Sequence, residues 1–216
     1  MQYFLYFSCS LILMTNIELI TGCMFCGKTE ELLRRIRREM IAGRKCQLFK
    51  PIIDDRYTKN AIHSHSQIML KAQPVSSVER IGKELKIDTD VIAIDEIQFF
   101  DDLIIHFCLN LNNQGKKIIL AGLNLDFRGE PFQFKNSDKH IGYLMPYSKV
   151  TTLRAICTRK NEKGEVCGKD ADYTQRIIDG KPALYNSPTI LVGSQEKYEA
   201  RCKNHHFIDK KTLIID

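Results

Sequence analysis

The sequence predicts an α/β fold in which a mostly parallel sheet is flanked by helices, with a small second module behind it. Short β-branched runs alternate with amphipathic runs over residues 16–150, a pattern typical of parallel sheets connected by helices. A glycine-flanked turn ending in Lys28-Thr29 joins the first of these runs to the second. From about Thr151 the pattern changes to short apolar runs, turns and several cysteines. These observations together favour a nucleotide-binding type of α/β unit followed by a smaller module.

The expected elements of the first unit follow from local patterns. Strands are expected where β-branched and aliphatic residues run together, at Ile17–Thr21, Cys46–Phe49, Val91–Ile94 and Lys117–Leu123. Helices are expected where apolar residues recur at helical spacing or a capping pattern opens the segment, over Thr29–Ala42, from Ser76 to about Lys86, and from Asp101 to Gln114. Ser76 with Glu79 resembles a capping box. Residues 52–74 show little periodicity, which predicts a loop or an irregular crossover.

Length and composition limit the class of protein. With 216 residues, 44% hydrophobic and 27% charged, the chain suits one or two globular domains and excludes wholesale disorder and coiled coil. We expect an N-terminal extension over residues 1–15, an α/β domain over 16–150 and a second domain over 151–216. The net charge of +6 permits a phosphate-bearing ligand and does not require a nucleic-acid polymer.

The N-terminal residues give information on the cellular compartment of the protein. Residues 1–14 are apolar but contain no Lys or Arg, whereas a secretory signal begins with a positively charged region. The run is also shorter than the roughly 20 residues that span a bilayer, so a membrane segment is the weaker interpretation. We expect Met14 to be the genuine start and the protein to be cytoplasmic. Disulfides are then not expected, and the eight cysteines are thiols or metal ligands.

The first candidate site is a phosphate-binding loop. Its pattern is G-x-x-x-x-G-K-[ST], in which backbone N–H groups surround phosphate oxygens, the lysine supplies charge and the Thr hydroxyl ligates Mg²⁺. A helix that begins directly after the loop adds its positive dipole end. The residues are Gly22, Cys23, Met24, Phe25, Cys26, Gly27, Lys28 and Thr29.

A pair of carboxylates supports the same interpretation. Asp95 ends the apolar run Val91–Ile94, in the place where an Asp completes the Mg²⁺ shell in P-loop proteins, and Glu96 follows directly. Adjacent carboxylates repel unless a cation or solvent relieves them. An acidic turn in solvent is the alternative, but beside a phosphate loop the pair predicts a nucleoside triphosphate bound with Mg²⁺.

The second module carries a candidate zinc site. Cys202-x-x-His205 has the spacing of a zinc knuckle, and Cys157 and Cys167 supply two further thiols, although nine residues separate them. His206 is the alternative fourth ligand. The competing interpretation is that these cysteines are small buried hydrophobic residues. The basic cluster from Arg34 to Arg38 is expected on a surface facing solvent or another subunit.

These residues together resemble the type II, zinc-containing, RecA-like thymidine kinases, from about Asn16 to His206. The resemblance rests on the order and spacing of several short motifs. They are Gly22–Thr29 followed by Glu31–Arg35, Asp55–Tyr57, Asp95-Glu96-x-Gln98-Phe99-Phe100, Gly122-Leu123-x-x-Asp126-Phe127, Pro131-Phe132, Tyr173-Thr174-x-Arg176, and Val192-Gly193 with Tyr198 and Cys202.

The resemblance implies transfer of the ATP γ-phosphoryl group to the 5′-hydroxyl of thymidine or deoxyuridine. By similarity Glu96 is the general base, and Asp95, Lys28 and Thr29 hold the triphosphate and Mg²⁺, with Ile97 and Gln98 beside the nucleotide. The family surrounds the nucleoside with a lasso-like loop. The matching positions are Met24, Phe99, Leu123, Phe127, Phe132, Thr174, Val192, Gly193 and Tyr198. The resemblance further implies a structural zinc, a homotetramer and feedback inhibition by thymidine triphosphate.

Two rival functions come from other classes: a nucleic-acid-associated ATPase and a regulator that binds nucleotide without catalysis. The mild charge argues against the first, and the intact Glu96 argues against the second. The chain also departs from the family, which usually has Pro and Ser or Ala where this sequence has Cys23 and Cys26. Two thiols beside the phosphates suggest sensitivity to oxidation.

Overall fold

The computed structural model describes residues 15–52, 71–189 and 196–209, and a six-stranded sheet lies at its centre. The strands follow the order β3-β2-β4-β5-β1-β6, and every neighbouring pair is parallel. Their bounds are β1 Ile17–Gly22, β2 Cys46–Pro51, β3 Gln73–Val75, β4 Val91–Ile94, β5 Lys117–Leu123 and β6 Lys149–Leu153. Because the strands are parallel, the carboxyl ends of β1, β4 and β5 meet at one edge of the sheet.

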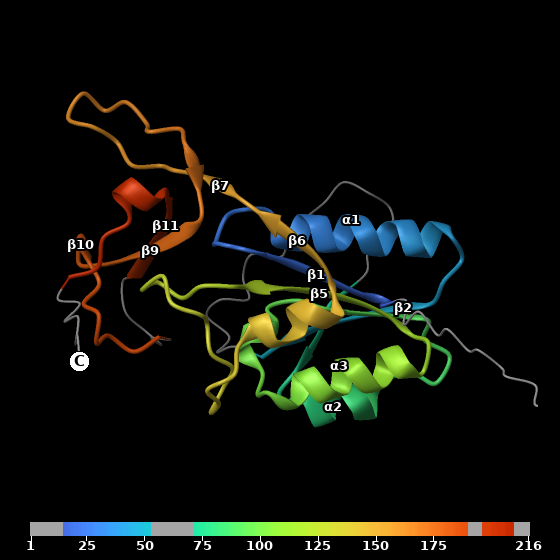
Figure 1. The fold of residues 1–216 in the computed structure, drawn as a ribbon. Coiled ribbons are helices and arrows are strands. Elements are labelled where there is room, and N and C mark those ends of the chain that lie inside the picture. Colours follow the sequence, from blue (N-terminus) through green and yellow to red (C-terminus); the bar gives the residue numbers. More distant parts are fainter. Residues whose placement is uncertain (1–14, 53–70, 190–195, 210–216) are drawn as a thin grey trace, which may run out of the picture.

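Helices cover both faces of this sheet, as Figure 1 shows. Helix α1 (Lys28–Ile41) buries Leu32 and Ile36 against one face. Helices α2 (Val78–Glu84) and α3 (Leu103–Asn113) pack on the other. Successive strand residues point to opposite faces, so neighbours along one strand belong to different apolar clusters. In β4, for example, Ala93 packs with α1 and Ile94 packs with α2 and α3.

Three 3₁₀ segments complete the set of helical elements in the described chain. They are η2 Ile97–Phe99, η3 Ile141–Tyr147 and η4 Lys203–His205. Segment η2 follows β4 almost directly, and it carries the residues just after the acidic pair. Within the described residues, no helix has both the length and the apolarity needed to cross a bilayer.

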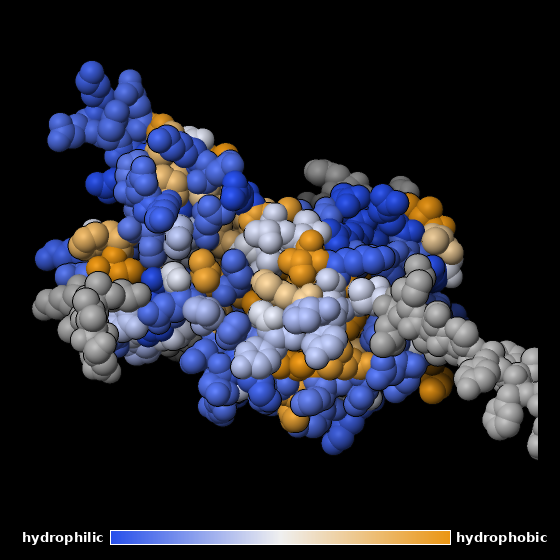
Figure 2. Space-filling model, viewed as in Figure 1, coloured by the Kyte–Doolittle hydropathy of each residue, from blue (hydrophilic) through white to orange (hydrophobic). Residues whose placement is uncertain are grey.

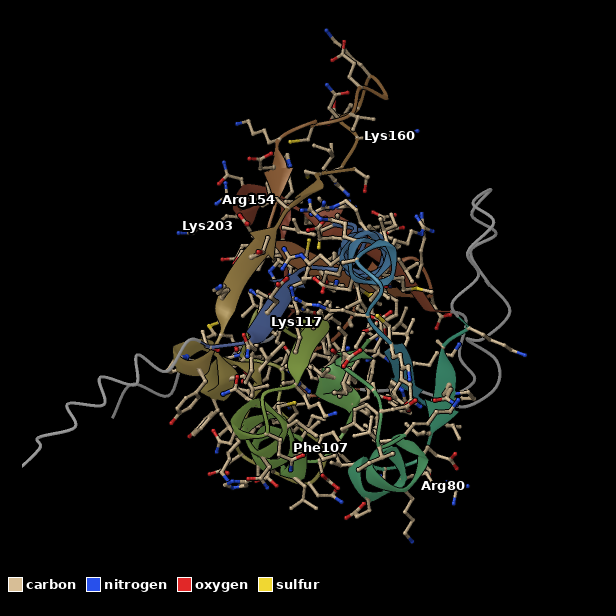
Figure 3. All side chains as sticks on the ribbon, turned by 90° about the vertical axis from the view of Figure 1, so that its right-hand side faces the viewer. Arg80, Phe107, Lys117, Arg154, Lys160 and Lys203 are labelled. Carbon is tan, nitrogen blue, oxygen red and sulfur yellow. The ribbon has the colours of Figure 1, made fainter. Side chains whose placement is uncertain are left out.

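The second module is built from short antiparallel strands. Strands β7 (Ala155–Ile156) and β8 (Asp170–Ala171) pair with each other. Strand β9 (Tyr173–Ile178) lies between β10 (Lys181–Pro182) and β11 (Glu196–Arg201). The chain between β7 and β8 projects as a polar tip, blue in Figure 2, and Lys160 lies along one arm of this tip, short of its outer end, in Figure 3.

The four expected strands and three expected helices of the first unit are present, with small shifts at their ends. Two strands were not predicted. Strand β3 overlaps the end of the expected crossover 52–74, where Pro74 and a length of three residues conceal its strand pattern. Strand β6 extends the sheet past the boundary expected at residue 150. Helix α2 is capped by Ser77, whose hydroxyl accepts the Arg80 N–H, and not by Ser76 as predicted.

Some expectations lie outside the described residues. They concern the apolar N-terminus with its start at Met14, the motif Asp55–Tyr57, and the lasso residues Val192 and Gly193. The division into domains stays a prediction.

Candidate functional site: a phosphate loop beside a Cys₃His cluster

The phosphate loop leaves the carboxyl end of β1 with unusual backbone angles. Gly22 has φ 146°, Phe25 φ 67° and Gly27 φ 85°, so three residues in this short turn have positive φ. A Cβ at Gly22 would lie 2.2 Å from the Leu153 carbonyl oxygen on β6, so no side chain fits there. Such turns direct backbone N–H groups to one side and form anion-binding concavities. Helix α1 begins directly after Gly27 and adds its N-terminal dipole.

Lys28 reaches back across this loop. Its side chain is buried, and Nζ donates a hydrogen bond of 2.7 Å to the Cys23 carbonyl oxygen. The same nitrogen lies 3.8 Å from Cys26 Sγ. The loop thus concentrates positive charge where the oxygens of a triphosphate would be bound.

Asp95 and Thr29 form a candidate Mg²⁺ site. The Thr29 hydroxyl donates a hydrogen bond of 2.9 Å to Asp95 Oδ2, which brings the ends of β4 and the phosphate loop together. Burial disfavours the charged carboxylate, and the adjacent Glu96 charge adds to this, so the pKa of Asp95 is raised to about 6. Hydroxyl and carboxylate oxygens are the ligands that Mg²⁺ prefers, and a divalent cation would offset both effects. The residues therefore fit the predicted metal.

Glu96 is held in place by Gln98. The backbone of Glu96 lies in the left-handed region, with φ 51° and ψ 44°. Gln98 Nε2 donates a hydrogen bond of 2.6 Å to Glu96 Oε2, and Gln98 Oε1 accepts the Leu123 N–H at 3.0 Å. Gln98 is buried, so this amide clamps the carboxylate to the end of β5. Strained backbone at a polar side chain is commonly found at functional sites.

The predicted zinc ligands meet in one cluster. Cys157, Cys167, Cys202 and His205 place their ligand atoms within 4.8 Å of one another. His205 Nδ1 lies 3.6 Å from Cys157 Sγ and 3.5 Å from Cys202 Sγ. Tetrahedral Zn²⁺, with its usual bond lengths to sulfur and nitrogen, requires roughly 3.6 Å between these atoms. The cluster is therefore compatible with a structural zinc.

His206, the alternative ligand, has a different environment. Its Nε2 donates a hydrogen bond of 2.9 Å to the Phe127 carbonyl oxygen, and its ring stacks on Tyr173 at 4.8 Å between centroids. Burial lowers the pKa of His206, which keeps the ring neutral. The geometry thus favours His205 as the fourth member of the cluster and leaves His206 to join β9 to the α/β unit.

The phosphate loop packs directly on this second module. The Met24 N–H donates a hydrogen bond of 3.0 Å to the Thr174 hydroxyl, and the Cys23 thiol donates one of 3.2 Å to the Ala171 carbonyl oxygen. Cys23 also shares an apolar cluster with the buried zinc-cluster thiols Cys157 and Cys202. The loop and the Cys₃His cluster are thus neighbouring parts of one structure.

The aromatic residues among the expected nucleoside-binding set make two separate sets of ring contacts. Phe99 and Phe132 contact edge to face at 5.6 Å. The buried Arg176 guanidinium lies over the Phe127 ring at 5.2 Å and the Tyr198 ring at 5.9 Å. Leu123 ends β5 beside them, and Thr174 meets Met24 as described. Which of these side chains contact a nucleoside stays a prediction.

Arg128 is a partly buried residue next to the predicted nucleoside-binding residue Phe127, and the sequence reasoning did not single it out. Its guanidinium bonds Asp126 Oδ2 at 2.6 Å, the Tyr185 and Ser187 carbonyl oxygens at 2.7 Å, and the Thr189 hydroxyl at 3.0 Å. It therefore ties the loop after β5 to the segment that leads to residue 190. The one sequence signal was the Asp126-x-Arg128 spacing, which is too common to single out an arginine.

In this structure the parallel strand β1 leads into a glycine-flanked Lys-Thr loop, and an Asp-Glu pair directly follows the parallel strand β4. This arrangement defines the P-loop class of nucleoside-triphosphate-binding proteins. Within that class, the sequence matches the family described as thymidine kinase over residues 15–206, and the chain belongs to this family. Membership of this family is the basis for the activity proposed below.

Among solved structures, the chain is similar to the crystal structure of domain III of the Thermotoga maritima replication initiation protein DnaA. The TM-score is 0.39 and the sequence identity is 15%, over 66% of this chain and 56% of that one. The chain thus spans a little over half the length of that solved structure.

Proposed function

We propose that the protein transfers the γ-phosphoryl group of ATP to the 5′-hydroxyl of thymidine, giving dTMP and ADP in nucleotide salvage, and that deoxyuridine is a second substrate. Membership of the thymidine kinase family supports this proposal. The observation that carries it is the Glu96 carboxylate, which Gln98 fixes beside the Thr29–Asp95 pair. A protein that only bound nucleotide would have no need of a second, oriented carboxylate at this place.

Phosphoryl transfer depends mainly on positioning and charge stabilisation. In the proposed reaction the loop N–H groups and Lys28 bind the phosphates, while Thr29 and Asp95 hold Mg²⁺. Bound Mg²⁺ neutralises charge that develops on the phosphate oxygens. Gln98 engages Glu96 Oε2, so the other carboxylate oxygen is the one proposed to accept the proton of the 5′-hydroxyl.

The nucleoside is proposed to bind between the loop and the second module. The proposed contacts are Met24, Phe99, Leu123, Phe127, Phe132, Thr174 and Tyr198, together with Val192 and Gly193. The contact between Met24 and Thr174 supports this placement, because it joins the phosphate loop to the strand beside the lasso. Zinc bound by Cys157, Cys167, Cys202 and His205 would hold this side of the site in shape.

The remaining parts of the proposal concern the location, oligomeric state and regulation of the enzyme. We propose a cytoplasmic homotetramer, inhibited by thymidine triphosphate, that acts on free nucleosides and not on a nucleic-acid polymer. The net charge of +6 supports the last point, since polymer binding usually requires a stronger basic surface.

One assay tests the reaction against its rivals. The purified protein is incubated with ATP, Mg²⁺ and each deoxynucleoside in turn, with and without DNA, and ADP and nucleotide products are measured. We expect turnover that requires thymidine or deoxyuridine and does not respond to DNA. ATP turnover that is indifferent to thymidine but stimulated by DNA would instead identify a nucleic-acid-associated ATPase. Nucleotide binding without any turnover would indicate a regulator.

A further inference from the structure

The side-chain thiols of two cysteines in the phosphate loop have no role in the reaction proposed above. Cys23 and Cys26 are separated by two residues, and Cys26 is two positions before the start of α1. A Cys-x-x-Cys pair at a helix N-terminus is an arrangement in which thiols are activated for disulfide exchange. The sequence alone did not suggest a pairing, because the same positions are explained by the phosphate-loop pattern.

The structure places both cysteines at the same apolar cluster. Cys23 is a buried member of the cluster between the loop and the second module, and Cys26 packs against this cluster. Cys23 is buried, and Cys26 is partly exposed. Lys28 Nζ lies 3.8 Å from Cys26 Sγ. The thiol that solvent reaches is thus the one next to a positive charge.

This arrangement makes the two sulfurs chemically unequal. The neighbouring Cys23, together with the charge of Lys28, lowers the pKa of Cys26, while the neighbouring Cys26 and burial raise the pKa of Cys23. Burial also raises the pKa of Cys46 to about 11 and that of Cys108 to about 12. Cys26 is therefore the better nucleophile among these thiols, and Cys23 is placed to act second.

We propose that Cys23 and Cys26 form a reversible disulfide by exchange with low-molecular-weight disulfides, and that this modification prevents the phosphate loop from binding nucleotide. The inference rests on the proposed function in one respect, namely that ATP binds at this loop. It assigns the pair as a covalent modification site whose reactant is a small dialkyl disulfide.

The exchange balances in two steps. The Cys26 thiolate attacks one sulfur of the small disulfide, whose S–S bond breaks, and one thiolate leaves and takes up a proton. Cys23 then loses its proton and attacks Cys26 Sγ, which breaks the mixed disulfide and releases the second small thiol. Two cysteine thiols are oxidised and one small disulfide is reduced to two thiols.

The expected loss of nucleotide binding follows from the tight packing of the phosphate loop. Cys26 Sγ already lies 2.8 Å from the position of a Cβ on Gly22, and Lys28 Nζ is bonded to the Cys23 carbonyl oxygen. An S–S bond of about 2 Å draws the two cysteines together and fixes a dihedral angle that the turn must follow. The N–H groups that line the loop then lose the arrangement that binds phosphate. For the same reason, bound ATP is expected to slow the exchange.

The test uses the full-length, zinc-loaded protein treated with oxidised glutathione. We expect peptide mapping to find a Cys23–Cys26 disulfide, ATP affinity to fall at least about 10-fold, dithiothreitol to restore it, and ATP to protect the thiols. Cys26→Ser and Cys26→Ala, each compared with its own untreated sample, should show no further loss on treatment. Cys46→Ser is the matched control and should respond like the wild type.

Several results would overturn the inference. One is a mapped Cys23–Cys26 disulfide with unchanged ATP affinity. Another is loss of ATP binding that accompanies zinc release and disulfides among the Cys₃His thiols, with Cys26 still free. If the untreated, folded protein binds ATP but does not phosphorylate thymidine, the proposed function fails while the redox response is still measured by ATP affinity. If the untreated protein binds no ATP, both proposals fail.

Discussion

Glu96 combines an energetically unfavourable backbone conformation with a side chain that is held in one direction. Its left-handed conformation costs a residue other than glycine of order 1 kcal/mol or more, and the hydrogen bond from Gln98 helps to determine the side-chain direction. A surface carboxylate would gain nothing from this arrangement. Such a residue is a good subject for a substitution that keeps its shape and removes its basicity.

Glu96→Gln should lower kcat by at least about 100-fold, because an amide cannot accept the proton of the nucleoside hydroxyl. The Kd for ATP should change little, since Lys28 and the loop bind the phosphates. Steady-state kinetics and equilibrium ATP binding measure the two effects. Glu162→Gln, in the exposed tip, is the control and should behave like the wild type. An unchanged kcat in Glu96→Gln would mean that the general base is another group.

Arg128 makes a network of partly buried hydrogen bonds that could not be predicted from the sequence. The phosphate loop could be predicted because its chemistry requires particular residues at fixed spacing. Arg128 bonds two main-chain carbonyl oxygens more than 50 residues further along the chain, and carbonyl oxygens leave no trace in a sequence. The choice of His205 over His206 was open for a similar reason, because both spacings are sterically possible before the fold is known.

Arg128→Ala should raise the KM for thymidine by about 10-fold or more and change the KM for ATP much less. The loss of charge-assisted hydrogen bonds, each worth about 1.5–3 kcal/mol, frees the segment that leads to the lasso. Arg128→Lys should not rescue the defect, because lysine cannot bond several oxygens in a planar fork. Arg159→Ala, on the exposed tip, is the control. Equal losses in both KM values would indicate a general structural role.

At the scale of elements, helix α1 is fixed to the sheet by an ionic network. Arg35 bonds Glu31 on its own helix and Glu18 on β1, each at 2.8 Å, and Lys117 on β5 bonds Glu18 at 2.7 Å. These side chains are largely shielded from solvent, so their interactions are screened less than those of exposed pairs. The network joins α1, β1 and β5 on the side away from the phosphate loop.

This network predicts a pH dependence of stability. Arg34 and Arg35 lower the pKa of Glu31 to about 2, from an ordinary value of 4.5. A lowered folded-state pKa contributes stability that is fully present above pH 4.5 and is lost as the pH falls towards 2. Glu31→Gln should therefore reduce the free energy of unfolding by about 1 kcal/mol at pH 7 and by less at pH 3. Urea unfolding at both pH values measures this. A difference that does not shrink at low pH would contradict it.

Elements were predictable where the burial of one or both faces determined the pattern of apolar residues. The apolar spacing of α1 and the fully apolar β4 each have a single physical explanation. Strand β6 is different, because it lies at the sheet edge beside β1 and its side chains are mostly exposed or partly exposed. Its assignment to the sheet depends on a partner more than 120 residues away. Strand β3 and the segment η3 likewise have no local pattern strong enough to predict them.

At the scale of the whole molecule, the Cys₃His cluster and the phosphate loop share one apolar cluster. Cys202→Ala should lose about one equivalent of zinc and lower the melting temperature, because structural zinc contributes directly to folding free energy. ATP affinity should fall with it, since the Cys23 contacts lie in the same cluster. Metal analysis, thermal unfolding and ATP binding measure the three effects, with Cys46→Ala as control. A metal-free wild-type protein would rule out the site.

The close packing around Gly22 limits which substitutions the phosphate loop can tolerate. A side chain at this position would collide with the Leu153 carbonyl oxygen. A Cβ on Gly27 would meet only Glu30 Oε2, at an ordinary contact distance of 3.8 Å, so the left-handed φ of 85° is the main obstacle to a side chain there. In a saturation library sorted only for the amount of folded protein, we expect every substitution at Gly22 to disappear and several at Gly27 to survive. Sorting for catalysis would then remove the Gly27 variants as well. The first glycine of the loop is thus constrained by folding, and the second chiefly by function.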